Sequence, residues 1–257
     1  MNNEMQAALI LYTVRQKCSS IAELADALER ISKIGYKAVQ FSALPGIEPE
    51  AVRELFDKNS LQCCGSHESL PDLTGNIDAV IKRLKILGCS YAAIAHPGGD
   101  FPHTLKPDKL ASVLNGIAKR LKDSGIRFGY HNHAVEFEKI GGKTMLDYLY
   151  DNTDPELVFA EIDTFWIQHG GQNPAAWIRK LKNRVYAVHF KDFAVKGNSI
   201  KNAEVGEGNL DWDDIIRACR ESNVRWCVVE QDNPTEGRDI FESVSMSYDY
   251  LKKMNVK

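Results

Sequence analysis

Two histidines and two glutamates lie close together in the stretch Tyr130–Glu138, which reads Tyr-His-Asn-His-Ala-Val-Glu-Phe-Glu. A short apolar run precedes it and a glycine pair follows, so it is typical of a strand that ends and passes into a loop. Alternate side chains of a strand share a face, which would direct His131 and His133 the same way, about 7 Å apart. A polar loop edge with two hydrogen-bonded histidines is the alternative to a functional site.

The positions of the seven histidines favour the functional site. None falls in a predicted helix or in a loop at the opposite end of the predicted strands, whereas histidines placed by chance would divide between the two ends. Those at or near strand ends are His67, His96, His131 and His189, and those in the loops just after are His103, His133 and His169.

Carboxylates are expected beside these histidines. Glu161 and Asp163 lie two residues apart on one predicted strand, so the strand directs both the same way. If Asp163, Glu230 and a glutamate of the 130–138 stretch meet, their repulsion requires either a protonated carboxyl or a cation between them. Imidazole beside carboxylate oxygens suits a divalent ion such as Mn, Co, Zn or Mg. Surface ion pairs with lysine and arginine are the alternative.

The elements that would position these residues alternate between strand and helix along the whole chain. Apolar runs predict eight strands, and apolar residues at helical spacing predict eight helices between them. A polar loop is expected from residue 193 to 209. The strands are expected over 8–13, 37–41, 61–67, 90–96, 126–132, 157–163, 184–191 and 225–231, and the helices over about 20–35, 49–59, 77–88, 107–125, 144–150, 174–181, 212–221 and 238–253.

This alternation implies right-handed crossovers and a parallel sheet. Eight such units in 257 residues predict an α/β fold that is a single (β/α)8 TIM barrel, one domain over residues 1–257. An open doubly wound sheet is the alternative, but no Gly-x-Gly-x-x-Gly follows the first strand. In a barrel of this kind the active site lies at the carboxyl ends of the strands, where the histidines and acids are predicted.

Composition excludes several function classes. The formal net charge is −3, which provides no basic surface for nucleic acid and no polybasic patch for a membrane. No apolar run approaches the roughly 18 residues of a membrane span, and the first residues lack the basic start of a signal segment. The six cysteines contain no Cys-x-x-Cys pair, so we expect reduced, buried thiols and a cytoplasmic protein.

Several motifs occur together from one end of the chain to the other: residues 11–15, 130–137, 163–166, 189–192, 206–208 and Glu230. With them the chain resembles the xylose isomerase-like superfamily, and within it the sugar phosphate isomerase/epimerase group, which includes ketose 3-epimerases, inosose dehydratase and enzymes that act on 3-oxo-glycosides. The resemblance implies one bound divalent metal ion and a small carbohydrate substrate. It also implies a homodimer or homotetramer, because relatives are often dimers or tetramers.

The metal ligands of such relatives are a Glu, Asp, His and Glu from successive strands. Asp163, His189 and Glu230 match the last three. For the first ligand we choose Glu136, with His131 and Glu138 as the alternatives. The chain departs from the relatives at two positions: Gln40 stands where many have Glu, and Trp166 stands where the ketose epimerases have a substrate-contacting histidine.

The implied chemistry is proton abstraction next to a sugar carbonyl, with the cation as Lewis acid for the enediolate. Glu136 and Glu230 are the candidate bases, and His131, His133 or Lys191 would handle the second proton. Lys191 shares a face with His189, although an ion pair with Asp192 or Glu207 is an alternative role. The residues expected to contact substrate are Trp166, Glu161, His67, His96 and Glu207.

The same intermediate leads to two outcomes. Its reprotonation makes an isomerase or epimerase, whereas loss of a β-substituent makes a lyase or hydratase acting on 3-oxo-sugars.

Two further hypotheses belong to other classes of protein. A nuclease related to the apurinic-site endonucleases would need a basic surface that this chain lacks, and a sugar-binding or accessory barrel would retain the pocket without the chemistry.

Overall fold

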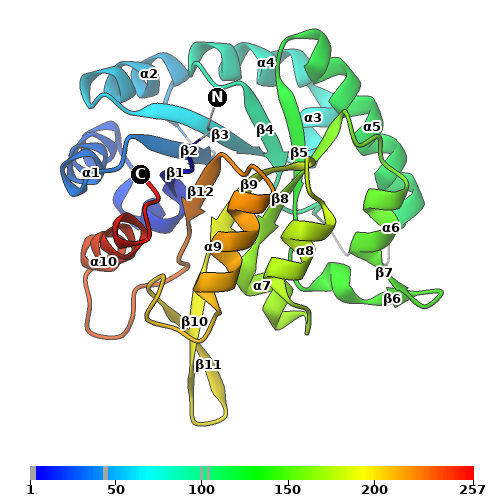
Figure 1. Cartoon of the computed structure of the whole chain (residues 1–257). Helices are drawn as coiled ribbons and strands as arrows, with labels where there is room; N and C mark the ends of the chain where they lie inside the picture. The colour runs from blue at the N-terminus through cyan, green and yellow to red at the C-terminus, as the bar shows by residue number, and fades with distance from the viewer. Residues whose placement is uncertain (1–3, 43–45, 99–100, 103–104) are drawn as a thin grey trace.

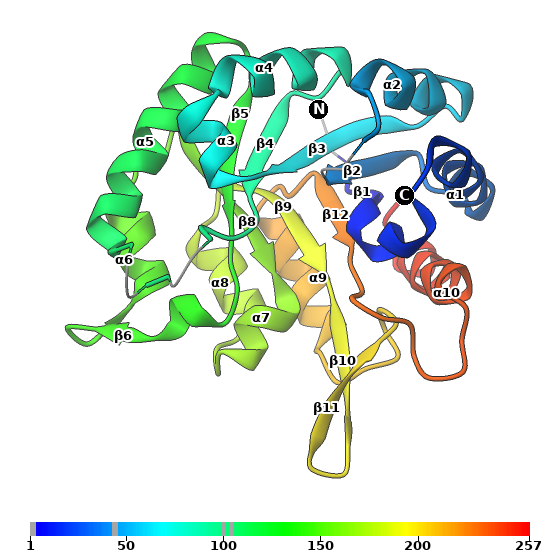
Figure 2. The same ribbon diagram turned by 180° about the vertical axis from the view of Figure 1, so that it is seen from behind.

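The computed structural model describes residues 4–42, 46–98, 101–102 and 105–257. Eight parallel strands close into a barrel, and helices surround it (Figure 1, and from behind in Figure 2). The predicted (β/α)8 barrel is therefore confirmed. In their order around the barrel the strands are β1 (Gln6–Ile10), β12 (Trp226–Val229), β9 (Val185–Phe190), β8 (Val158–Asp163), β5 (Arg127–His131), β4 (Tyr91–Ile94), β3 (Gln62–Glu68) and β2 (Ala38–Ser42).

The surrounding helices begin and end where local signals predict. Ser20 caps the first by accepting a hydrogen bond from the Glu23 amide, and Gly35 ends it at a φ of 128°. Pro49, Pro107 and Pro174 each open a helix, a position where proline loses no helical hydrogen bond. The outer ring consists of α1 (Ile21–Ile34), α2 (Pro49–Lys58), α4 (Ile77–Ile86), α5 (Pro107–Asp123), α6 (Met145–Asp151), α8 (Pro174–Lys180), α9 (Trp212–Glu221) and α10 (Ile240–Lys253).

Three short helical elements at the carboxyl end of the barrel were not predicted. The first strand stops at Ile10, and the next residues form the 3-10 helix η1 (Leu11–Lys17). Helix α3 (Leu70–Gly75) follows β3, and α7 (Thr164–His169) follows β8. The expectation that His169 lies in a loop is wrong, because it is the last residue of α7; His103 lies outside the described residues.

The stretch 193–209, expected to be a polar loop, contains most of a hairpin. Strand β10 (Asp192–Lys196) pairs with β11 (Ser199–Ala203), and the hairpin extends away from the barrel (Figure 1). Its base is closed by the carboxylate of Asp192, which accepts hydrogen bonds from the amides of Gly206 and Gly208 and from Trp212 Nε1. A second small hairpin, β6 (Lys139–Ile140) with β7 (Lys143–Thr144), follows β5.

Large aromatic side chains fill the barrel below its mouth. The ring of Tyr91 stacks on that of Tyr186 with centroids 3.8 Å apart, and Tyr91 is fully buried. A Cβ at Gly129 would lie only 1.9 Å from the Tyr91 hydroxyl, so glycine is required beside this ring. None of the helices that the structure describes is both long and apolar enough to cross a membrane.

Candidate metal centre in the barrel mouth

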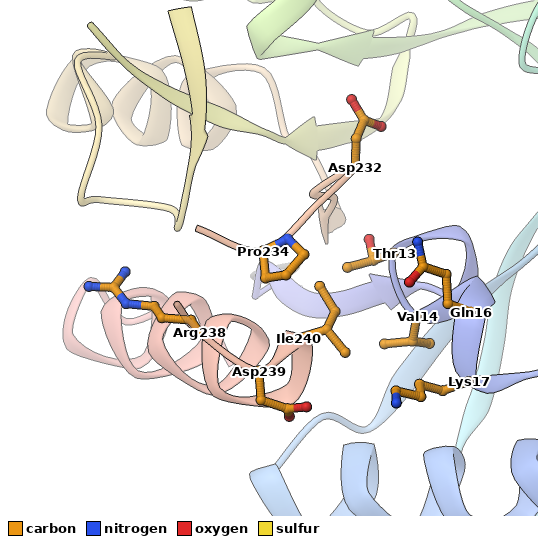
Figure 3. A pocket seen from close by; sticks show the side chains of 9 residues that line it. All are labelled: Thr13, Val14, Gln16, Lys17, Asp232, Pro234, Arg238, Asp239 and Ile240. Carbon is orange, nitrogen blue, oxygen red and sulfur yellow. The ribbon is translucent and has the colours of Figure 1, made fainter. Parts of the chain in front are cut away.

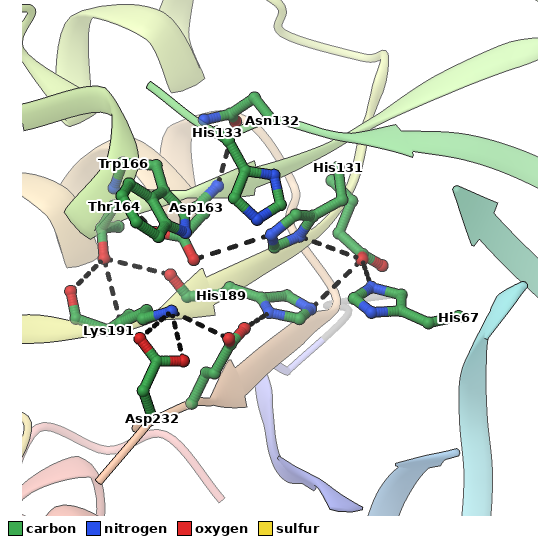
Figure 4. A network of polar contacts seen from close by, with 12 residues as sticks. His67, His131, Asn132, His133, Asp163, Thr164, Trp166, His189, Lys191 and Asp232 are labelled. Atoms are coloured by element: carbon green, nitrogen blue, oxygen red, sulfur yellow. Dashed lines mark hydrogen bonds and ion pairs between the residues drawn. The ribbon is translucent and has the colours of Figure 1, made fainter. Parts of the chain in front are cut away.

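Strand register brings the predicted residues side by side at the carboxyl end of the barrel. His131 is the register partner of Glu161, and Asp163 is the partner of His189. His67 comes from β3, and Glu230 directly follows β12. All of these except His67 are buried, and Figure 4 shows the side chains of His67, His131, Asp163 and His189 converging.

Glu161 lies at the inner side of this cluster, among three histidines. Its Oε1 contacts Nε2 of His67 and lies 3.4 Å from Nδ1 of His131 and 3.2 Å from Nε2 of His189. Gln40 Nε2 also donates to both Glu161 oxygens, at 3.2 and 3.1 Å. Burial opposes ionisation, but His67 and His189 hold the Glu161 pKa well below its usual value. Glu161 is therefore a fixed buried anion.

Two further carboxylates, Asp163 and Glu230, lie on the outer side of the same histidines. His189 Nδ1 is 2.5 Å from Glu230, and His131 Nε2 is 3.7 Å from Asp163 Oδ2. Asp163 Oδ1 accepts from the Trp166 amide and caps α7, whereas its buried Oδ2 has no hydrogen-bond partner among the described residues. Burial raises the Asp163 pKa to about 7. An unpaired buried oxygen of this kind indicates a missing positive partner.

Lys191 supplies positive charge on the cavity side. Its Nζ donates to Glu230 at 2.9 Å and to Asp232 at 3.0 Å. Burial alone would lower the Lys191 pKa, but these carboxylates and Asp163 raise it, so the amine stays protonated. The alternative of an ion pair between Lys191 and Asp192 or Glu207 does not occur.

The histidines differ in charge. Burial alone would lower the pKa of His189, but Glu161 and Glu230 raise it to about 10, so without a cation this imidazole is protonated at pH 7 and would have to release a proton to bind one. Burial and the neighbouring His189 lower the pKa of His131 to about 4, and burial lowers that of His133 to about 2. His131 and His133 are therefore neutral at pH 7 and keep a ring nitrogen lone pair, the form that binds metals.

A cavity of about 370 Å³ opens above the cluster. Trp166 and Tyr12 supply aromatic surface, and buried Trp166 Nε1 and His133 Nδ1 have no hydrogen-bond partner among the described residues. Its walls consist of Ile10, Tyr12, His67, Ala95, His96, His131, His133, Trp166, Lys191, Glu230 and Asp232.

A smaller hollow of about 180 Å³ lies beside the mouth, between η1 and the start of α10 (Figure 3). Asp232 lines both spaces. Lys17 and Arg238 lie opposite Asp239 there, and Asp239 already caps α10. The mixed charges give no clear ligand preference.

The donor set of the main cluster fits a divalent cation. One ligand atom each from His131, Asp163, His189 and Glu230 lies within 4.8 Å of all the others. A second such set joins His67, His131, Glu161 and His189, but its carboxylate is already hydrogen-bonded on both oxygens. Two imidazoles and two carboxylates suit Mn, Co, Zn or similar ions. The Asp163–Glu230 side therefore offers the better cation site.

The structure does not bring every expected residue to this site. Glu136 is buried elsewhere, where it accepts from the Tyr130 hydroxyl at 2.7 Å and the His133 amide at 2.8 Å. Glu138 and Glu207 are exposed, and neither lines the cavity. His131 occupies the place for which Glu136 was chosen.

Sequence reasoning missed four wall residues, Ile10, Tyr12, Ala95 and Asp232, and for Asp232 and Tyr12 the sequence held a signal that could have found them. Asp232 contacts Lys191, and its position two residues after Glu230 on one strand end was a usable signal. Tyr12 lies in η1 with 43% of its surface exposed, at the end of the first strand where site residues are expected.

Curated relatives of known name are similar over part or most of the chain. Inosose dehydratase from Clostridium beijerinckii is 27% identical over 160 residues, which cover 56% of this chain and 53% of that protein. The chain thus matches only about half the length of this relative. Inosose dehydratase from Lacticaseibacillus casei is 22% identical over 262 residues, covering 88% of this chain and 87% of that protein.

Solved structures share the fold along nearly the full chain. A sugar phosphate isomerase/epimerase from Parabacteroides distasonis has a TM-score of 0.83 at 22% identity, covering 98% of this chain and 100% of that one. D-allulose 3-epimerase from Methylomonas, in complex with D-allulose, has a TM-score of 0.75 at 14% identity and covers 97% of each chain. At these identities the likeness establishes the fold alone.

The sequence also matches a family model over residues 28–252, which is most of its length. The resemblance suggested by the spacing of the motifs is thereby confirmed. The chain belongs to the xylose isomerase-like TIM barrel family.

Proposed function

We propose that this chain is a divalent-metal-dependent enzyme that abstracts a proton next to the carbonyl of a small carbohydrate and acts as an isomerase or epimerase. The observation that carries the proposal is the convergence of Asp163, Glu230, His131 and His189 below the cavity, with Asp163 Oδ2 unpaired. These four residues would hold the cation, with His131 in the place of Glu136. The cation would supply Lewis-acid stabilisation of the oxygen that gains charge.

Glu230 is the proposed base. It is the one carboxylate that both belongs to this ligand set and lines the cavity. Burial opposes its ionisation, but Lys191 and His189 hold the Glu230 pKa well below its usual value, so the carboxylate is ionised at pH 7. Lys191 would place a positive charge beside the developing oxyanion.

The opposite wall would bind and orient the sugar. Trp166 Nε1 and His133 Nδ1 offer unused hydrogen-bonding atoms for hydroxyl groups, and the aromatic faces of Trp166 and Tyr12 suit the apolar face of a sugar ring. His96 lies beside His133, with ring centroids 5.5 Å apart. His67, bound to Glu161, forms the cavity floor.

The charge of the walls favours an uncharged sugar over a sugar phosphate. Lys191 is the only lysine or arginine among the described lining residues, and Glu230 and Asp232 already pair with it. Phosphate recognition ordinarily uses arginine, lysine or free backbone amides.

A second outcome, elimination of water from a 3-oxo-sugar, uses the same base and cation. The names of the curated relatives favour it, because inosose dehydratases are the matches over both half and most of the chain. In addition, Glu230 and Asp232 are joined by one lysine and so lie on one side of the cavity. One-sided proton transfer suits isomerisation or elimination better than epimerisation by two opposed bases.

Metal analysis by mass spectrometry is the first test, on untagged protein purified without chelator. We expect about one divalent ion per chain, lost in His189→Ala. No metal in the native protein, even after soaking in manganese, would overturn the enolisation mechanism and leave a binding or accessory barrel.

A sugar panel in heavy water then separates the outcomes. Deuterium uptake with an isomeric product indicates an isomerase or epimerase, and an unsaturated product with loss of water indicates a dehydratase. Metal binding without deuterium uptake by any neutral or phosphorylated sugar of the panel would indicate a non-catalytic sugar-binding protein.

A further inference from the structure

Two histidines in the barrel mouth, His189 and His131, each lie between two carboxylates. One ring nitrogen of each histidine faces one carboxylate, and the other nitrogen faces the second. His189 has Nδ1 2.5 Å from Glu230 and Nε2 3.2 Å from Glu161. His131 has Nδ1 3.4 Å from Glu161 and Nε2 3.7 Å from Asp163. The two rings are therefore reversed, because Nε2 of His189 and Nδ1 of His131 face Glu161.

Glu161 does not have the surroundings of a substrate contact. The side chain has no exposed surface and does not line the cavity. Gln40 Nε2 donates to both of its oxygens, and His67 contacts one of them. Its hydrogen-bonding capacity is used within the protein, unlike that of Asp163, whose Oδ2 is unpaired.

Gln40 fixes the tautomer of His189. Since the Gln40 amide nitrogen donates to the two Glu161 oxygens, its amide oxygen is the atom facing His189 Nε2, at 2.8 Å. An amide oxygen only accepts hydrogen bonds, so Nε2 of His189 must carry a hydrogen. The lone pair of a neutral His189 is then on Nδ1, the nitrogen that faces Glu230.

The geometry of His131 gives the opposite nitrogen. Its Nδ1 lies on the Glu161 side, 3.4 Å from that carboxylate and without a hydrogen-bond partner among the described residues. Its Nε2 faces the unpaired oxygen of Asp163 at 3.7 Å, so Nε2 is the nitrogen on the side of the cation site. Outer carboxylates commonly orient metal-binding imidazoles in this way.

We propose that Glu161, held in place by Gln40, is a positioning residue that makes His189 bind the cation through Nδ1 and His131 through Nε2. This inference rests on the metal site of the proposed function. It places Glu161 behind the ligands and not in contact with substrate, for which the sequence had suggested it.

Nitrogen NMR of the full chain, labelled with ¹⁵N-histidine and loaded with Zn²⁺, tests the assignment directly. We expect His189 to show a protonated Nε2 and a zinc-bound Nδ1, and His131 to show a protonated Nδ1 and a zinc-bound Nε2. Substitution of each histidine identifies its signals. Binding of both histidines through the same nitrogen would overturn the inference.

Two variants test the role of Glu161 by affinity. Glu161→Gln removes the charge, and Gln40→Leu removes the hydrogen bonds that hold Glu161 and His189. We expect Glu161→Gln to raise the Kd for Zn²⁺ about 10- to 100-fold and to shift the visible spectrum of the Co²⁺-loaded protein. Because both variants act through the same histidine, the double variant should bind about as weakly as Glu161→Gln alone.

Glu68→Gln is the matched control. Glu68 is also a buried carboxylate in the barrel, but it pairs with Ser66 and Arg83, and among the described residues it forms no hydrogen bond or ion pair with a histidine. It should leave the Zn²⁺ Kd and the Co²⁺ spectrum unchanged. If Glu161→Gln does not fold, Gln40→Leu with the NMR assignment decides the matter.

The outcomes also separate this inference from the proposed function. If the native chain binds no Zn²⁺, the metal site itself is absent and both proposals fail. If the native chain binds one ion but Glu161→Gln and Gln40→Leu keep its affinity and spectrum, the positioning role alone is overturned.

Discussion

The two carboxylate oxygens of Asp163 have different roles: one caps a helix, and the other is unpaired and faces the histidine cluster. Oδ1 caps α7 through the Trp166 amide, and Oδ2 faces His131 without a hydrogen bond. Asn132 holds the Asp163 amide from the neighbouring strand, at 3.1 Å. The cap fixes the orientation of the free oxygen, so this proposed ligand would be preorganised before any cation binds.

The identity of the fourth ligand gives the first prediction. His131→Ala removes a nitrogen that faces Asp163, so Mn²⁺ affinity in isothermal titration should fall by about 10- to 100-fold or more. Glu136→Gln should keep the affinity of the native chain, because Tyr130 and the His133 amide occupy that carboxylate. Loss of binding in Glu136→Gln with binding kept in His131→Ala would restore Glu136 as the ligand.

At the scale of single residues, the sequence predicted which residues converge and from which strands they come, but not the direction of every side chain. Asp163, His189 and Glu230 were found because they end barrel strands at matching positions. Glu136 was chosen by motif, yet it lies five residues past the end of β5, where the 3-10 turn η2 (Val135–Phe137) directs it to Tyr130. Strand periodicity says nothing about a side chain beyond the strand end.

Strand β5 can be tested through its glycine. A Cβ at Gly129 would lie 1.9 Å from the hydroxyl of Tyr91, so Gly129→Ala should lower the free energy of unfolding by about 1–3 kcal/mol in urea titrations. Adding Tyr91→Phe removes that hydroxyl, which has no hydrogen-bond partner in the described chain, and should restore part of the loss.

The control for this prediction is Gly116→Ala in α5. A Cβ there meets nothing within 4 Å, so the change should be neutral or stabilise the helix by up to about 1 kcal/mol. Equal destabilisation by both substitutions would mean that the contact with Tyr91 is not the cause.

The segment between β12 and α10 depends on one buried acid, Glu204. Its carboxylate accepts hydrogen bonds from Ser243 at 2.6 Å and Thr235 at 2.8 Å and pairs with Arg238. Burial opposes ionisation, but these hydrogen bonds lower the Glu204 pKa to about 2. An acid whose pKa is lowered by folding stabilises the protein above its unfolded pKa, near 4.5, and loses that contribution as the pH falls toward 2.

Glu204→Gln should therefore cost about 2 kcal/mol of unfolding free energy at pH 7. The difference from the native chain should shrink as the pH falls from about 4.5 toward 2, measured by urea unfolding across that range. Glu54→Gln, an exposed acid on α2, should change neither value. A difference that stays constant with pH would show that ionisation of Glu204 is not responsible.

The regular elements were predictable because apolar periodicity and caps specify them locally. The additional ones were not. Helix α7 is only six residues long and starts from the metal-site residue Asp163, and the β10–β11 hairpin carries exposed apolar residues, Val195 and Ile200, in an otherwise polar stretch. Both are fixed by single buried carboxylates, Asp163 and Asp192, and such tertiary contacts leave no periodic pattern.

At the scale of the whole molecule, the ionisable site residues and the tightly packed aromatic residues lie at different levels of the barrel. The ionisable cluster and the open cavity lie at the carboxyl end, while Tyr91 and Tyr186 fill the interior below them. The barrel predicted from the sequence correctly placed the site residues at the carboxyl ends of the strands. This was possible because the order of strands and helices along the chain determines which loops lie at the same end of the barrel.

The six cysteines are all reduced and all buried, so the rate at which their thiols react reports how often the folded chain opens. Burial raises the pKa of Cys18 to about 12 and those of Cys64 and Cys219 well above the usual value, and a hydrogen bond with Cys63 together with burial does the same for Cys89, so these four thiols form almost no reactive thiolate. A thiol reagent such as DTNB should therefore label the native chain only as fast as it unfolds. Added Mn²⁺ should slow that colour change, whereas rapid labelling of one thiol without unfolding would reveal a local opening at that cysteine.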